Sequence, residues 1–146
     1  MQILGQTFGG RGWGWADWPL RIALASVFLT AGIPKWYNIQ HTADMMKLPL
    51  IVAILVASAE VGGSLLILLG GFGDTWAFDY ATRFAGFGYM TVMTGAIFLV
   101  HWGQWLNIAT PSHPGGGIEF PFTLWMIGFF FLLRGNSVRK KGWAPR

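Results

Sequence analysis

The chain has 146 residues, of which 53% are hydrophobic and 11% charged, and its formal net charge at pH 7 is +4. Soluble domains carry roughly 25% charged residues, so this composition excludes an ordinary soluble domain and favours one membrane domain over residues 1–146. The chain contains no cysteine, which excludes disulfides, thiolate metal sites and a redox-active thiol pair. Its basic residues lie at the ends of apolar segments, a distribution that does not indicate nucleic-acid binding.

Four apolar segments follow one another along the chain, at about 19–35, 49–70, 80–101 and 119–134. A helix that crosses a bilayer needs about 20 apolar residues, which the longer of these segments reach. Asp17 and Pro19 mark the first helix start, where Asp17 is expected to cap the helix. Polar connections occupy 38–48 and 101–119, and a basic tail covers 135–146. We therefore predict an all-α, polytopic membrane protein with a four-transmembrane-helix bundle.

The basic residues predict the orientation of this bundle in the membrane. One side would carry eight of them and the other side two, Lys35 and Lys47. The eight are Arg11, Arg21, Arg83, Arg134, Arg139, Lys140, Lys141 and Arg146. Cytoplasmic segments of membrane proteins are enriched in Lys and Arg. We therefore predict a multi-pass protein of the cell (inner) membrane, with both termini in the cytoplasm and the two polar connections on the outer side.

Glu60 stands near the middle of the second apolar segment. A carboxylate at that depth is costly, so it should face other helices or a wet cavity, where a proton or a hydrogen-bond partner would neutralise its cost. Small residues surround it at a spacing of four, Ser58 with Gly62 and Ala59 with Gly63, and this spacing favours close approach of another helix. Two interpretations stay open, a structural hydrogen bond between helices and a binding or proton-transfer site.

Several polar side chains complete a candidate site around this acid. His101 and Glu119 fall at the outer ends of the segments, whereas Arg21 and Arg83 fall about one turn inside the opposite membrane boundary. Quinones need hydrogen bonds to their carbonyls and protons on reduction, which such a set could supply. The candidates for cofactor binding are Glu60, Lys35, His101, Glu119, Arg21 and Arg83, and the candidates for catalysis are Glu60 and His101.

Each of these residues also has a simpler interpretation. Lys35 is expected to extend its ammonium to the outer headgroups, and Arg21 and Arg83 to extend theirs to the inner ones. An acid at the start of a helix, such as Glu119, is favoured by the helix dipole without any further function.

A metal site built from His101, His113 and Glu119 is the weaker alternative, because their spacing matches no metal-binding motif. We predict no metal and no intrinsic cofactor, with quinone as the candidate for a bound cofactor.

Three pieces of the sequence combine glycines with charged residues. The first span contains Arg21 and Phe28-x-x-x-Gly32-x-x-Lys35, and the second contains Glu60-x-Gly62-Gly63-x-x-Leu66-x-x-x-Gly70. The third is Gly116-Gly117-Ile118-Glu119-Phe120, which leads into an apolar helix closed by Gly135. In their order and spacing these pieces resemble the DoxX-like family of small four-helix membrane proteins. The resemblance implies a four-helix bundle and a link to quinone-dependent oxidation, as in a subunit of thiosulfate:quinone oxidoreductase. After the final glycine the family often has a Ser-x-Asp-like segment, and this chain has Asn136-Ser137-Val138-Arg139 instead.

The sequence therefore predicts an accessory subunit of a membrane redox complex that lines a quinone or lipid pocket beside Glu60. Its partners would be membrane lipids and other subunits of that complex. The alternatives are a subunit that itself reduces quinone, with protons from Glu60 and His101, and a purely structural or assembly protein.

Overall fold

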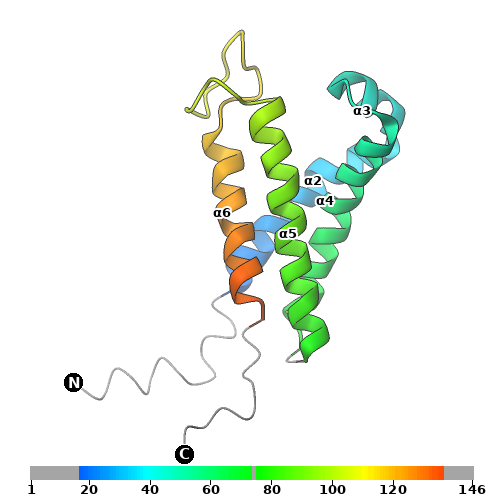
Figure 1. Ribbon diagram of the computed structural model, residues 1–146, viewed down its shortest axis with the longest axis vertical. Coiled ribbons are helices and arrows are strands. Elements are labelled where there is room, and N and C mark those ends of the chain that lie inside the picture. The colour runs from blue at the N-terminus through cyan, green and yellow to red at the C-terminus, as the bar shows by residue number, and fades with distance from the viewer. Residues whose placement is uncertain (1–16, 74, 137–146) are drawn as a thin grey trace, which may run out of the picture.

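A computed structural model describes residues 17–73 and 75–136 of the chain. Within these residues the fold contains five helices and no strand, so the predicted all-α class is confirmed. The helices are α2 (Trp18–Tyr37), α3 (Ile39–Met46), α4 (Leu50–Gly70), α5 (Trp76–Leu99) and α6 (Glu119–Arg134) (Figure 1). Arg11 and the basic tail beyond Asn136 lie outside the described residues.

The helix ends agree with the predicted segments at some positions and differ at others. α4 and α6 match, but α2 continues past Pro34 to Tyr37, and α5 begins at Trp76, before the predicted start near residue 80. Asp17 makes no side-chain cap to α2, contrary to the prediction. Its carboxylate instead forms an ion pair with Arg134 at the end of α6, so it ties the two chain ends of the bundle together.

The predicted polar connection at 38–48 contains the short helix α3. Thr42 and Ala43 of this helix are buried, and α3 packs against α4. The left-handed backbone of Lys47, with φ of 52°, ends the helix and turns the chain into α4. Because isolated helices of this length are unstable in water, α3 depends on that packing.

The four long helices pack in the order α2, α4, α5, α6. α4 lies between α2 and α5, and α5 packs on α6, whereas α2 and α6 touch over a small area. The core contains Leu24, Ala25, Phe28, Ile67, Ala85, Tyr89, Met93, Leu124 and Phe131. Figure 1 shows α4 and α5 diverging toward the end of the molecule that carries α3. The bundle is therefore tight at one end and open at the other.

Within the described residues, α4 is the one helix that is long and apolar enough, by length and composition alone, to cross a membrane. α6 has 16 residues. α2 and α5 are longer, but they carry charged side chains, Arg21 and Lys35 in α2 and Asp79 and Arg83 in α5. The positions of these charges inside the bundle define the site described next.

Candidate ligand-binding site

An ion pair between α2 and α4 lies at the centre of the site. The Nζ atom of Lys35 is 2.5 Å from Oε1 of Glu60. Glu60 is almost completely buried, with 3% of its side chain exposed, whereas 23% of the Lys35 side chain is exposed. The prediction that Lys35 extends outward to the headgroups is wrong, because its ammonium points to the acid.

Gly32 explains how the two helices come close enough for this pair. A Cβ atom at Gly32 would lie 2.8 Å from Cβ of Glu60 and 2.9 Å from Cγ2 of Val61, closer than real Cβ atoms approach. Only glycine therefore fits at this crossing of α2 and α4. Lys35, three residues further along α2, is then within reach of the Glu60 carboxylate.

The second carboxylate oxygen of Glu60 has no hydrogen-bond donor among the described residues. Oε2 is buried, and no donor in the described part of the chain lies within hydrogen-bond distance of it. Buried polar atoms are nearly always hydrogen-bonded, so an unsatisfied one in a native fold requires an explanation. Among the described residues Lys35 likewise donates one hydrogen bond, although an ammonium has three donors.

A short hydrogen-bonded chain fixes the backbone below Glu60. The hydroxyl of Ser64 donates to the backbone carbonyl of Glu60 at 2.7 Å, and the Tyr89 hydroxyl lies 3.3 Å from Oγ of Ser64. The Tyr89 ring stacks on Phe28 with a centroid distance of 4.1 Å. Sequence reasoning did not identify Ser64, although it stands four residues after Glu60 on the same helix face.

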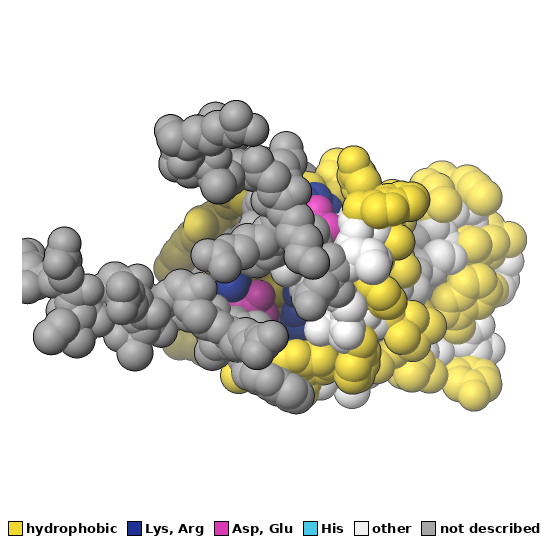
Figure 2. Space-filling view, turned by 90° about the horizontal axis from the view of Figure 1, so that it is seen from below, with side chains coloured by type: hydrophobic (Ala, Val, Ile, Leu, Met, Phe, Trp, Pro, Cys, Tyr) yellow, Lys and Arg dark blue, Asp and Glu magenta, His cyan; other side chains and the backbone are white. Residues whose placement is uncertain are grey.

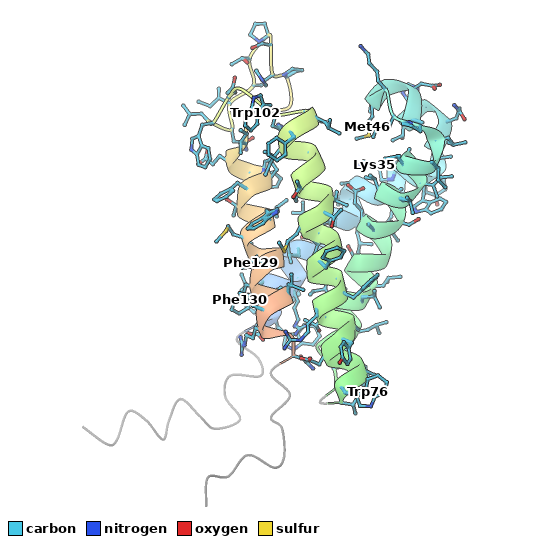
Figure 3. The ribbon with its side chains drawn as sticks, in the orientation of Figure 1. Lys35, Met46, Trp76, Trp102, Phe129 and Phe130 are labelled. Atoms are coloured by element: carbon cyan, nitrogen blue, oxygen red, sulfur yellow. The ribbon has the colours of Figure 1, made fainter. Side chains whose placement is uncertain are left out.

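Beside the ion pair lies a cleft of about 890 Å³ between α2, α4, α5 and α6. Its walls are mostly apolar, and three ionisable side chains border it, Lys35, Glu60 and His101. Apolar lining includes Val27, Phe28, Val52, Leu55, Val56, Leu66, Phe84, Phe87, Val92, Met93, Leu99, Phe120 and Leu124. Met46 of α3 also lines the cleft, and Figure 3 shows Met46 and Lys35 at the end of the molecule where α4 and α5 diverge.

Three glycines leave the floor of the cleft unfilled. A Cβ atom added at Gly62, Gly88 or Gly95 would meet nothing within 4 Å, and all three border the cleft. The adjacent Gly63 differs, because a Cβ atom added there would lie 3.1 Å from the Tyr89 ring. The small-residue face predicted around Glu60 therefore divides into a helix contact at Gly63 and open space at Gly62.

The outer histidines and Glu119 hold the loop between α5 and α6. His101 Nδ1 lies 2.8 Å from the carbonyl oxygen of Gly116, and His113 Nε2 lies 2.8 Å from that of Trp102. Glu119 accepts a hydrogen bond from the backbone N–H of Asn107 at 3.1 Å. Only His101 of these three borders the cleft. In the described ranges no group of three His, Cys, Asp or Glu residues could hold a metal ion.

Arg21 lies at the tight end of the bundle and is 1% exposed, so the prediction that it extends to the headgroups is wrong. Its guanidinium donates to the carbonyl of Ile67 at 2.7 Å, to the Thr82 hydroxyl at 3.1 Å and to Oδ1 of Asn136 at 3.0 Å. Ile67 belongs to the last turn of α4, where carbonyl groups lack helical partners. Arg21 is therefore the C-terminal cap of α4.

Arg83 caps α6 in the same way. It donates to Asp79 at 2.8 Å and to the carbonyls of Leu132 and Leu133, both at 2.7 Å. A cation at a helix C-terminus is also favoured by the helix dipole. Figure 2 shows acidic and basic side chains side by side at this end of the molecule, among hydrophobic ones. Asn136 links the two arginines. Its side-chain oxygen accepts from Arg21, and its backbone N–H donates to Asp79, which is the ion-pair partner of Arg83.

Comparison with known proteins agrees with the predicted resemblance. The family model described as DoxX matches residues 16–102, which include α2, α4, α5 and the Lys35–Glu60 pair. The predicted family motifs at Gly116–Phe120 and Gly135 lie outside that match. No curated protein and no solved structure gives a significant match to the chain. On the family match, which covers more than half of its residues, the chain belongs to the DoxX family of multi-pass membrane proteins.

Proposed function

We propose that this DoxX protein is an accessory subunit of a membrane redox complex and holds a quinone in the cleft beside Lys35 and Glu60. The observation that carries the proposal is an apolar cleft with one ion pair in its wall. Small-molecule sites measure about 300–1,000 Å³ and combine apolar walls with a few polar groups, and this cleft meets both criteria.

The polar wall of the cleft favours an uncharged headgroup. The charges of Lys35 and Glu60 cancel each other, so an anionic phosphate would add an uncompensated charge at this depth. The two remaining donors of the Lys35 ammonium would instead suit a carbonyl oxygen, which accepts hydrogen bonds without carrying a charge. A quinone head presents such carbonyls.

The role of an accessory subunit follows from what the chain contains. It has no cysteine, and thus no thiol pair that could take electrons from a substrate. A quinone held here would therefore exchange its electrons with redox groups of a partner subunit. Both termini are proposed to lie in the cytoplasm, because the predicted charge bias places the end of the bundle that carries Arg21, Arg83 and Arg134 on that side.

One observation favours a second function, a subunit that itself takes part in quinone reduction. His101 borders the same cleft as Glu60, and its Nε2 has no hydrogen-bond partner in the described part of the chain. A Glu60→Gln variant would separate the two functions. Accessory binding needs only the headgroup contacts, whereas proton transfer by Glu60 requires a titratable group, so turnover would fall although the complex still assembles.

The test is quinone extraction after purification in mild detergent. Wild-type protein should carry quinone, and Gly88→Leu should lose most of it, because the new side chain would enter open space in the cleft. Leu65→Phe is the matched control, since Leu65 is 53% exposed on the same bundle and borders no part of the cleft. Absence of quinone from the wild type, or full retention by Gly88→Leu, would contradict the proposal. A redox protein that co-purifies in stoichiometric amount would support the accessory role.

A further inference from the structure

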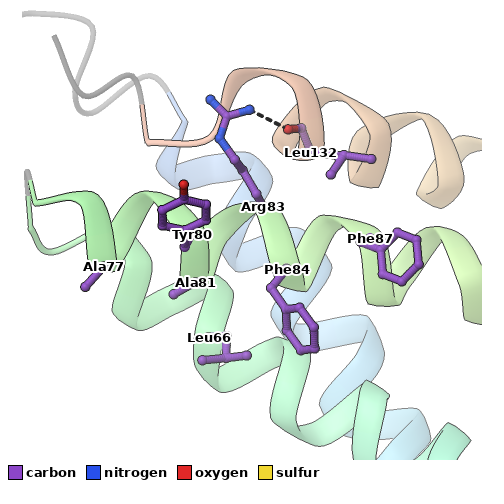
Figure 4. Close-up of a pocket in the computed structure, with 8 residues that line it drawn as sticks. All are labelled: Leu66, Ala77, Tyr80, Ala81, Arg83, Phe84, Phe87 and Leu132. Carbon is purple, nitrogen blue, oxygen red and sulfur yellow. Dashed lines mark hydrogen bonds between the residues drawn. The ribbon is translucent and has the colours of Figure 1, made fainter. Parts of the chain in front are cut away.

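Besides the cleft, a groove lies on the surface of the bundle along α5. It measures about 560 Å³ and is formed by residues of α4, α5 and α6, as Figure 4 shows. Its lining consists of Leu66, Ala77, Tyr80, Ala81, Arg83, Phe84, Phe87 and Leu132. Apart from Tyr80 and Arg83 these side chains are apolar, so the groove suits a hydrocarbon chain.

The groove continues the cleft described above. Leu66, Phe84 and Phe87 line both spaces, so the groove and the cleft are adjacent and share these three side chains. Along α5 and its C-cap the combined lining runs from Ala77 to Val100. At ~1.5 Å per residue this path is about 35 Å long, which is close to the ~30 Å thickness of a bilayer core.

The contacts between α4 and α5 show where the ion pair lies on this path. Gly63 packs on Tyr89, and Gly70 packs on Thr82, so the two helices run antiparallel. Glu60 then stands about one turn beyond Tyr89, on the side of Val100. From that level to Ala77 the path extends for about 20 Å, by the helical rise per residue.

Arg83, at the far end of the groove, does not require an anionic ligand as a counter-charge. Arg83 already donates to Asp79 and to the carbonyl groups of Leu132 and Leu133. Its charge is thus engaged by its own fold, and the ion pair at the other end is neutral as a whole. A phospholipid would have to place its phosphate at one of these ends, whereas an uncharged head with a long tail needs no such counter-charge.

From this geometry we infer that the site binds a quinone with a long isoprenoid tail, in one orientation. The headgroup lies at Lys35 and Glu60, and the tail passes Leu66, Phe84 and Phe87 into the groove at Ala81. The tail points toward the end of the bundle where Asp17 and Asn136 lie. This inference rests on the proposed function, because it requires a quinone head in the cleft.

Photo-crosslinking in lipid nanodiscs tests the orientation. One long-tailed quinone analogue carries a diazirine on its ring, and a second carries it at the tail end. Peptide mapping should place the ring label on segments around Lys35 and Glu60, and the tail label on the first half of α5, from Trp76 to Phe87. A tail label that spreads over lipid-exposed surfaces, or maps to the loop at 101–118, would overturn the inference.

A pair of variants separates this inference from the proposed function. Ala81→Trp fills the groove, so the tail label should leave the first half of α5 while the ring label stays unchanged. Leu65→Trp introduces the same side chain at an exposed position of α4 that borders neither the groove nor the cleft, and it should change neither label. If Ala81→Trp leaves the tail label in place, the inference is wrong and the proposed function stands. If the ring label never maps to Lys35 and Glu60, the proposed function itself is wrong.

Discussion

Replacing Lys35 by methionine removes one partner of the buried ion pair and keeps most of the length of the side chain. Glu60 would then be a carboxylate with 3% of its side chain exposed and no remaining donor within reach among the described residues. The close contact of Gly32 with Cβ of Glu60 holds the acid at the crossing of α2 and α4. Removing one partner of a buried pair costs about 3–5 kcal/mol of stability.

We expect Lys35→Met to lower the free energy of unfolding by about 3 kcal/mol, at the lower end of this range. The partial exposure of Lys35 means that the wild-type pair is already partly solvated. At about 1.4 kcal/mol per factor of ten, this loss corresponds to roughly a hundredfold change in the ratio of folded to unfolded protein.

The reverse change should cost much less. Glu60→Gln leaves Lys35, whose side chain is 23% exposed and can turn its ammonium outward along its flexible stem. The new amide also keeps hydrogen-bonding capacity, so we expect a loss of about 1 kcal/mol. The double variant Lys35→Met with Glu60→Gln should recover most of the loss seen in Lys35→Met, because no buried charge remains.

Equilibrium unfolding in mixed detergent micelles, followed by helical circular dichroism, measures these four proteins side by side. The essential result is the order of stability. Lys35→Met should be well below Glu60→Gln, and the double variant should be closer to the wild type than to Lys35→Met. Equal losses for the two single variants would refute the reasoning, since it depends on their unequal burial. A Lys35→Met protein as stable as the wild type would show that the pair contributes nothing.

Three further predictions concern packing, topology and the polar cluster at the tight end. Gly63→Leu should overpack against Tyr89, at a cost of about 1–3 kcal/mol of stability, which thermal unfolding in detergent would show as a lower unfolding temperature. The adjacent Gly62→Leu should be nearly neutral, because its side chain enters open space. A cysteine at Ser112 should react with an impermeant label only from outside the cell, and labelling only from the cytoplasm would reverse the predicted topology. Asn136→Ala removes two side-chain hydrogen bonds and leaves a buried guanidinium short of one acceptor, so thermal unfolding should show a loss of about 1–3 kcal/mol, and no loss would contradict the capping role.

The positions of the helices were largely predictable from the sequence. Long apolar runs and glycine-rich turns predicted α4 and α6 within one residue of their observed bounds. α3 was not predicted, because eight residues of mixed polarity carry a weak helical signal and their stability comes from packing on α4. α2 ends two residues after the predicted bound at about residue 35, because the helix continues past Pro34 to Tyr37.

The ion pair was not predictable from the sequence, although both of its members were identified as candidates. Position along the predicted helices placed Glu60 near the middle of its segment and Lys35 at the outer headgroups, so the two were not expected to pair. That expectation treats the helices as parallel rods, and a sequence does not give the crossing angle or the contact at Gly32 that brings Lys35 to the acid. Helix crossing depends on side-chain packing over the whole interface.

The two charged layers of the bundle differ in how fully their hydrogen bonds are made among the described residues, and this difference supports the site proposed beside Glu60. At the tight end, Arg21 donates to three acceptors from three parts of the chain, and Arg83 caps α6 in the same manner. At the open end, Glu60 keeps an oxygen without a donor, and Lys35 keeps donors without acceptors in the described chain. A fold that needed the ion pair only as a fastening between helices would gain stability by completing these bonds, as it does around Arg21. The incomplete layer is also the one that borders the cleft. There a carbonyl oxygen of the proposed quinone would accept a hydrogen bond from Lys35, whereas Oε2 of Glu60 needs a donor, such as the hydroxyl group of a reduced quinone.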